Sequence, residues 1–212
     1  MARQTVRFDR PLRTPPNHEA AAALLFLLDR HAPGVTPHMD RTAELAHAVA
    51  ARLEVGTYML QATVRAAHLH DVGKLGVPAR LLHKPGPLSE TEWSMIRQHP
   101  VLGEMLLART PGLASIAPLV RSTHERYDGR GYPDRLADEE IPLPSRIVAA
   151  CAAFDAMLEP RSHRPPLARG DAVEALRRGA GSEFDPLVVV SVLDEVDSSG
   201  NRRRIDCYLK EV

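Results

Sequence analysis

Most of the chain carries apolar residues at the spacing of amphipathic helices. From Asn17 the run NHEAAAALLFLLDRHA is rich in helix formers behind an Asn N-cap, and Pro33-Gly34 is expected to end it. Thr36 is then expected to cap a second helix that carries Pro37 in its first turn, where a missing N–H costs nothing. The pattern therefore predicts two helices before residue 55.

Two of the expected helices direct titratable residues toward the core. His38 falls on the apolar face of the second helix, so it should point inward. A third helix is expected to follow Gly56, and its apolar stripe continues onto Asp71 and close to His70. These apolar positions are Leu45, Val49 and Leu53 in the second helix and Leu60, Val64 and Ala67 in the third.

The middle of the chain shows a strong helix start followed by a glycine-rich loop. Ser89 and Glu92 have the spacing of a capping box, and we expect the helix that they begin to carry His99 near its end. A helix over about residues 113–125 should deliver His124 into the loop DGRGYPDR. Because its two glycines permit a tight turn, this loop is a candidate lip of a substrate site.

The last third of the chain also favours helices. We expect one over residues 144–158, a shorter one over 171–178, and a final helix capped by Asp185-Pro186. The final run LVVVSVL is β-branched and could form a strand by propensity, but the Asp-Pro start favours a helix.

These elements predict an all-α fold, a helical bundle of about seven or more helices. A chain of 212 residues with 44% hydrophobic content suffices for one compact domain, which we place at residues 17–196. Residues 1–16 lack apolar periodicity and are expected to form an extended or disordered arm. Residues 197–212 are interpreted as a tail that adds a short strand at most.

Charge and cysteine content exclude several classes of partner. Lysine plus arginine equals aspartate plus glutamate, 27 each, so no net field favours DNA, RNA or an anionic membrane, and any anion site must be local. The two cysteines, Cys151 and Cys207, lie far apart, and we see no secretory leader, so we expect a cytoplasmic protein. The longest apolar run, residues 20–28, is too short for membrane insertion.

The candidate chemistry lies in histidines and one aspartate at the inner ends of different expected helices. Imidazole with carboxylate suits divalent iron, manganese or zinc, and the two oxygens of Asp71 could bridge two ions. Two ions ~3.5–4 Å apart can supply hydroxide at neutral pH and neutralise the attacking and leaving oxygens at phosphorus. Lys74 would then offset charge on a non-bridging phosphate oxygen. The predicted ligands are His38, His70, Asp71, His99 and His124.

Six motifs in order resemble the HD-GYP subgroup of the HD-domain metal-dependent phosphohydrolases. They are HDVGKLGVP, LLHKPGPLSETEW, QHPVLGEMLL, HERYDGRGYP, IPLPSRIVA and GSEFDP, and the likeness covers about residues 36–193. The resemblance implies a helical bundle around a metal centre. It also implies metal-dependent hydrolysis of cyclic di-GMP to linear or mononucleotide products.

The resemblance assigns a role to individual residues of this chain. It implies that Lys74 contacts phosphate and that Tyr132 lies near the substrate. Arg161 and Arg164 match a basic pair that meets phosphates in the family, although both could be ordinary surface arginines. The metal histidines of the family correspond to His38, His70 and His99, beside Asp71.

Three positions depart from the family pattern. Thr123 stands where the family has the first of two consecutive histidines, and Ala152 stands where it has a metal-binding aspartate. Asp155 matches a second aspartate, which normally binds no metal. One helical turn separates it from Ala152, so its carboxylate cannot replace the missing ligand at that position. Gly34 replaces a glutamate that some members use, so we do not expect three metals. Two ions with three protein groups each remain feasible, with Asp71 shared.

Three functions remain open at this stage. The first is an HD-GYP-type phosphodiesterase that cleaves a cyclic dinucleotide through hydroxide bound to two divalent metals, with Asp71 and Lys74 as catalytic residues. The second is a degenerate module that binds a nucleotide or a signalling protein through the GRGYP loop without turnover. The third is a regulatory domain within a longer signalling protein.

Overall fold

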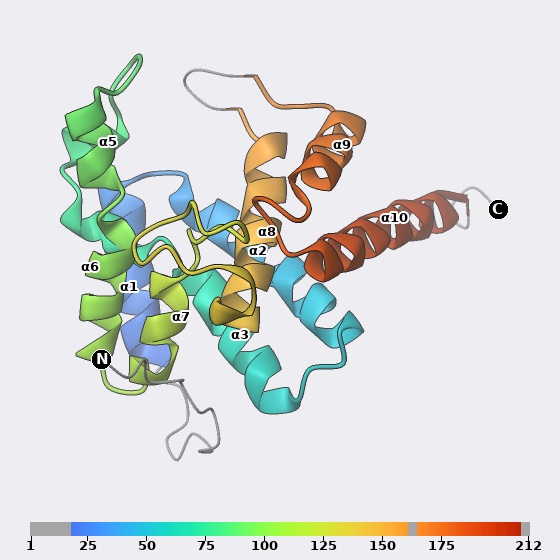
Figure 1. Cartoon of the computed structure of the whole chain (residues 1–212), viewed down its shortest axis with the longest axis horizontal. Helices are drawn as coiled ribbons and strands as arrows, with labels where there is room; N and C mark the ends of the chain where they lie inside the picture. The colour runs from blue at the N-terminus through green and yellow to red at the C-terminus, as the bar shows by residue number, and fades with distance from the viewer. Residues whose placement is uncertain (1–17, 161–164, 209–212) are drawn as a thin grey trace.

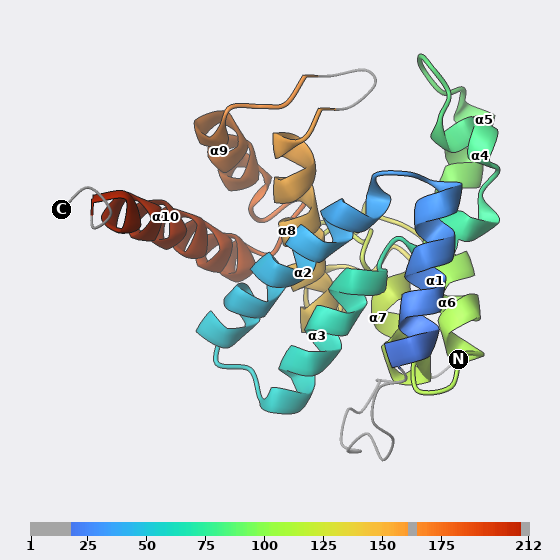
Figure 2. The same cartoon turned by 180° about the vertical axis from the view of Figure 1, so that it is seen from behind.

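The computed structural model describes residues 18–160 and 165–208, with side chains from Glu19 to Asp197. Within these residues the secondary structure is helical, and the β-structure consists of an isolated bridge between Ala180 and Phe184 without a strand (Figures 1 and 2). The predicted all-α class is therefore confirmed. The expected arm at residues 1–16 lies outside the described residues.

Three helices form the centre of the domain. They are α2 (Val35–Arg52), α3 (Thr57–Leu69) and α8 (Leu143–Leu158), and each packs against the other two. Alanines on the facing sides let these helices approach closely, because interaxial distance follows the size of the contacting side chains. The buried residues at the centre include Ala43, Ala46, Ala50, Ala62, Ala66, Ile147 and Cys151.

A second group of helices packs around the short helix η1 (Val72–Gly76), which follows α3 in the chain. Both α1 (His18–His31) and α6 (His99–Ala108) pack against η1, and α7 (Ala117–Arg121) packs against α6. A small cluster of Leu28, Ala32 and Met39 joins α1 to α2. The remaining short elements are α4 (Ala79–Leu82), α5 (Glu90–Ile96), η2 (Ala114–Ile116) and η3 (Asp138–Glu140).

The chain ends with α9 (Arg169–Gly179) and α10 (Pro186–Tyr208), and α10 begins against α2 and α8 before it extends outward (Figure 1). The predicted cap is confirmed, because the Asp185 carboxylate accepts the backbone N–H of Leu187 at 2.8 Å. The β-branched run thus forms a helix. That helix continues through residue 197, so the segment expected to add a short strand or nothing extends α10.

Three predicted boundaries are wrong. The helix with the Ser89–Glu92 capping box ends at Ile96, and His99 begins the next helix, because Pro100 lacks an N–H and suits a first turn. The helix expected over residues 113–125 is divided into η2 and the short α7 for the same reason, with a proline in the first turn of α7. The N-cap of α2 is Gly34 rather than Thr36, because glycine adopts φ 89° there.

In the described part of the chain, no helix has the length and apolar content to cross a bilayer.

Candidate metal centre and adjoining pocket

Asp71 lies at the junction between α3 and η1, where it is 3% exposed and surrounded by nitrogen donors. Nζ of Lys74 lies 2.6 Å from its Oδ2. Nε2 of His99 lies 3.3 Å from Oδ1, and Nε2 of His70 lies 3.5 Å from Oδ2. A buried carboxylate must be paired, and here the ammonium group of Lys74 is the partner, while the two imidazole nitrogens lie close by.

Gly73 allows this junction to form. A Cβ atom at Gly73 would lie 1.8 Å from the carbonyl oxygen of His99 and 2.4 Å from the backbone nitrogen of Gly103. Only a residue without a side chain lets η1 lie this close to the start of α6. The close approach brings Asp71 within reach of His99.

Three of the histidines are held by their Nδ1 atoms. His70 Nδ1 lies 2.7 Å from the carbonyl of Ala67, and His99 Nδ1 lies 2.8 Å from the carbonyl of Ile96. Since a carbonyl only accepts, Nδ1 must donate in both, and the neutral ring then has its lone pair on Nε2. His38 Nδ1 lies 2.6 Å from Oδ2 of Asp155. Metal-binding histidines in proteins are oriented in this way.

The predicted ligands come together in two groups that share Asp71. Donor atoms of His38, His70 and Asp71 lie within 4.8 Å of one another, and so do those of Asp71, His99 and His124. Nε2 of His99 and Nε2 of His124 are 2.9 Å apart, a separation that requires a proton or a cation between the two nitrogens. Imidazole and carboxylate donors with anchored Nδ1 atoms fit divalent iron, manganese or zinc.

The protonation states of these groups also suit a metal. Burial lowers the pKa of His70 to about 4. The pKa of His124 lies well below its ordinary value, chiefly because of burial and to a smaller extent because of the neighbouring His99. Burial alone would raise the pKa of Asp71, but Lys74 and His70 outweigh it and keep the pKa well below the usual range. At pH 7 His70 and His124 are thus neutral and Asp71 is ionised, as metal ligands must be.

Asp155 supports His38 from α8. Its carboxylate accepts Nε of Arg41 at 2.7 Å as well as Nδ1 of His38, and Arg41 also pairs with Glu159. Burial would raise the pKa of Asp155, but the hydrogen bonds from His38 and Arg41 hold it below its ordinary value. Sequence reasoning missed this contact, because nothing in the spacing of residues 38 and 155 indicates that α2 and α8 are neighbours.

The structure also locates the two positions that lack the ligands of the family. Thr123 is buried, and its hydroxyl donates to the carbonyl of Val120 at 2.9 Å, so it is directed back toward α7. Ala152 lies one turn before Asp155 in α8 and has no donor atom. Neither side chain adds a ligand to the two groups.

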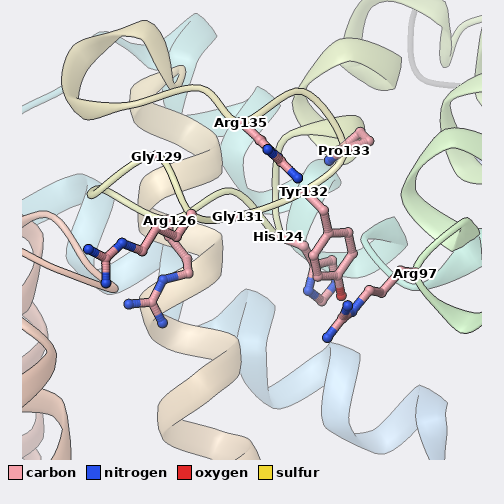
Figure 3. Close-up of a pocket in the computed structure, with 9 residues that line it drawn as sticks. Arg97, His124, Arg126, Gly129, Gly131, Tyr132, Pro133 and Arg135 are labelled. Carbon is pink, nitrogen blue, oxygen red and sulfur yellow. The ribbon is translucent and has the colours of Figure 1, made fainter. Parts of the chain in front are cut away.

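A pocket of about 660 Å³ adjoins the second group of ligands (Figure 3). His124 belongs to both, and the ring of Tyr132 stacks on it with centroids 5.2 Å apart and planes at 12°. Tyr132 therefore lies in the pocket, and its predicted place near the substrate stays a prediction. The lining residues are Arg97, His124, Arg126, Gly129, Arg130, Gly131, Tyr132, Pro133 and Arg135.

The loop that forms one side of the pocket is fixed by its glycines and by ion pairs. A Cβ at Gly131 would lie 2.3 Å from the backbone nitrogen of Arg126, so this position requires glycine. The backbone N–H of Asp134 donates to the buried Glu125 at 2.7 Å, and the Asp134 carboxylate pairs with Arg121 at 2.6 Å. The loop predicted to form the lip of a substrate site is thus held by its hydrogen bond to Glu125, its ion pair with Arg121 and the close packing at Gly131.

The pocket holds arginines that sequence reasoning did not single out. Three of the four lie in the segment RYDGRGYPDR, so the motif itself contained the signal. Lys74 pairs with Asp71 in this structure, and its predicted contact with phosphate stays a prediction. Arg161 and Arg164 lie outside the described residues, and their predicted role stays a prediction.

A family profile described as the HD domain matches residues 23–188. The chain belongs to the HD-domain family. Relatives include a cyclic di-GMP phosphodiesterase response regulator, RpfG, of Xanthomonas campestris, 36% identical over 162 residues, which are 76% of this chain and 43% of the relative. A cyclic di-GMP phosphodiesterase of Thermotoga maritima is 35% identical over 158 residues, 74% of this chain and 43% of the relative. The resemblance to the HD-GYP subgroup is confirmed.

Solved structures support the HD fold. An HDGYP protein from Bdellovibrio bacteriovorus, Bd1817, matches with a TM-score of 0.65 and 16% identity, over 85% of this chain and 62% of that chain. The HD domain of Listeria monocytogenes phosphodiesterase PgpH, in complex with cyclic di-AMP, matches with a TM-score of 0.60 and 17% identity, over 87% and 99%. The chain spans less than half the length of the curated relatives named above.

Proposed function

We propose that this HD domain is a metal-dependent phosphodiesterase that hydrolyses a cyclic dinucleotide, with cyclic di-GMP as the first candidate. One observation carries the proposal: the buried Asp71 is shared by two groups of imidazole donors, and the second group opens through His124 into a pocket lined by arginines. The names of relatives such as RpfG support the choice of substrate.

The proposed cofactor is a pair of divalent ions, iron or manganese in preference to zinc. His38, His70 and Asp71 would hold one ion, and Asp71, His99 and His124 the other. When bound, such ions lower the pKa of water and neutralise charge on the attacking and leaving oxygens at phosphorus. Three protein ligands for each ion leave coordination positions for water and substrate.

The side chains of the domain orient and neutralise the reacting groups. Lys74 keeps 23% of its side chain exposed beside Asp71, where its ammonium can offset charge on a non-bridging phosphate oxygen. Asp155 and Arg41 hold the ring of His38 in the orientation that directs Nε2 toward His70 and Asp71. Tyr132, Arg161 and Arg164 are proposed to contact the substrate. The cytoplasmic location expected from the sequence stays a prediction.

The test is hydrolysis of cyclic di-GMP by protein loaded with ferrous iron or manganese under anaerobic conditions. Asp71→Ala should abolish turnover, and Asp71→Asn, which keeps the shape of the side chain, should do the same in a protein that melts normally. Turnover that survives both substitutions would contradict the proposal.

A second function is favoured by the positions of Thr123 and Ala152, which contribute no ligand. In that case the domain binds a nucleotide, or a signalling protein through the GRGYP loop, without turnover. Chelation separates the two functions. An enzyme loses activity when its metal is removed, whereas a binding module keeps its ligand in the presence of chelator.

A further inference from the structure

The pocket beside His124 carries an unbalanced positive charge. Four arginines line it, and among the described residues that line it there is no aspartate or glutamate. A concave surface with charge of one sign concentrates ligands of the opposite sign. The protein as a whole has no net charge, so this excess of positive charge is local to the pocket.

Arg126 does not contribute to this excess. Its guanidinium pairs with Asp128 at 2.7 Å and with Glu183 at 3.1 Å, both outside the pocket lining. Figure 3 shows Arg126 across Gly131 from Tyr132 and Arg97. Its charge is therefore balanced by the protein.

The other three arginines make no ion pair within the described part of the chain: Arg97, Arg130 and Arg135. Arg97 is held at the pocket by aromatic rings, because its guanidinium carbon lies 5.9 Å from the centroid of Trp93 and 5.9 Å from that of Tyr132. Since Tyr132 stacks on His124, one aromatic ring separates Arg97 from the proposed metal group. Two guanidinium groups from the loop and one from the turn before α6 thus line the same pocket, and Arg130 also helps to lower the pKa of the neighbouring Asp128.

We propose that Arg97, Arg130 and Arg135 bind the second phosphate of the substrate, the one that is not cleaved. This inference rests on the proposed function, in which Asp71 and the histidines mark the site of the scissile phosphate. A cyclic dinucleotide carries two phosphodiester groups, each with one negative charge, so when one lies at the metal groups the other can lie in the adjoining pocket, in addition to any contact with Arg161 and Arg164. The planar guanidinium fork suits phosphate oxygens, and the three charges select substrates with two phosphates over simple diesters.

The test compares cyclic di-GMP with bis(p-nitrophenyl) phosphate, a diester with a single phosphate. The variants are Arg97→Gln, Arg130→Gln and Arg135→Gln, and Arg80→Gln on α4 is the matched control, since Arg80 is exposed and lies outside the pocket. Each pocket variant should lower kcat/KM for cyclic di-GMP about tenfold, as for a lost hydrogen bond to a charged group. The value for bis(p-nitrophenyl) phosphate should change less than twofold, and the control should match the parent on both substrates.

Two results would overturn the inference: an equal loss on both substrates, or no loss on either. If the parent protein hydrolyses neither compound, the proposed function fails, and equilibrium binding of cyclic di-GMP then decides the inference separately. Weaker binding by the three variants, but not by Arg80→Gln, would uphold the second phosphate site. Unchanged binding would refute it.

Discussion

Nδ1 of His38 lies 2.6 Å from Oδ2 of Asp155, across the packed helices α2 and α8. This contact fixes which nitrogen of His38 faces His70 and Asp71. The family resemblance implies a metal ligand at the position of Ala152, whereas here α8 contributes the carboxylate of Asp155 behind His38, a predicted ligand.

Removal of this carboxylate should weaken metal binding. We expect Asp155→Ala to lower the affinity for Mn²⁺ about 10- to 100-fold, as is typical when the partner of a metal-binding histidine is lost. Isothermal titration of the chelated protein measures the change. Glu174→Ala on α9 is the control, because it removes an exposed carboxylate that belongs to none of the groups that could hold a metal, and its effect should be much smaller. Equal affinities of Asp155→Ala and the parent would show that His38 needs no such support.

Restoration of the missing ligand should have the opposite effect. Ala152→Asp places a carboxylate where the family has one, and we expect tighter binding of Mn²⁺ and faster hydrolysis of cyclic di-GMP. Ala153→Asp adds the same charge one position later on α8 and should improve neither property. Metal content after dialysis and initial rates are the measurements, and a similar response of the two variants would count against a specific deficit at Ala152.

Gly73 should tolerate no side chain. Gly73→Ala forces a Cβ into the backbone of α6, so we expect a loss of about 1–3 kcal/mol or more in the free energy of unfolding. It should also weaken metal binding, because η1 and His99 must move apart. Gly170→Ala in α9 meets no atom within 4 Å and should be neutral or stabilising by up to about 1 kcal/mol. Urea denaturation of both variants tests this, and similar midpoints would contradict the packing argument.

The loop beside the pocket should lose stability in acid. Hydrogen bonds from Arg126 lower the pKa of Asp128 from 3.8 to about 2. Because the pKa is lower in the folded chain, the pair stabilises the fold fully above pH 3.8, and this contribution falls as the pH approaches 2. Asp128→Asn should therefore be less stable than the parent at pH 7, with a smaller difference at pH 3, in urea denaturation at low salt. A difference that grows in acid would contradict this assignment.

Periodicity and local motifs predicted much of this architecture. The Ser89–Glu92 capping box and the Asp185 cap are present, because both depend on residues within four positions of each other. The breaks before His99 and within residues 113–125 were not foreseen, since an apolar pattern continues across a proline that begins a new helix. The grouping of His38, His70, Asp71, His99 and His124 was expected from the family resemblance, and the structure brings them together.

Tertiary neighbours lay beyond the reach of such patterns. The pairing of His38 with Asp155 joins residues 117 positions apart, and the packing of Gly73 on His99 depends on how η1 meets α6. The arginines of the pocket come from a loop and from the turn before α6, and only the fold shows that they face one space.

The most direct test of the account is a titration of the metal-free protein with Mn²⁺ in which bound metal and the initial rate of cyclic di-GMP hydrolysis are measured in parallel. We predict no turnover in chelator, a rate that rises with bound metal to a plateau at two ions per chain, and neither binding nor turnover for Asp71→Ala. Full activity in the presence of chelator, or saturation with metal without any turnover, would contradict a metal-dependent phosphodiesterase.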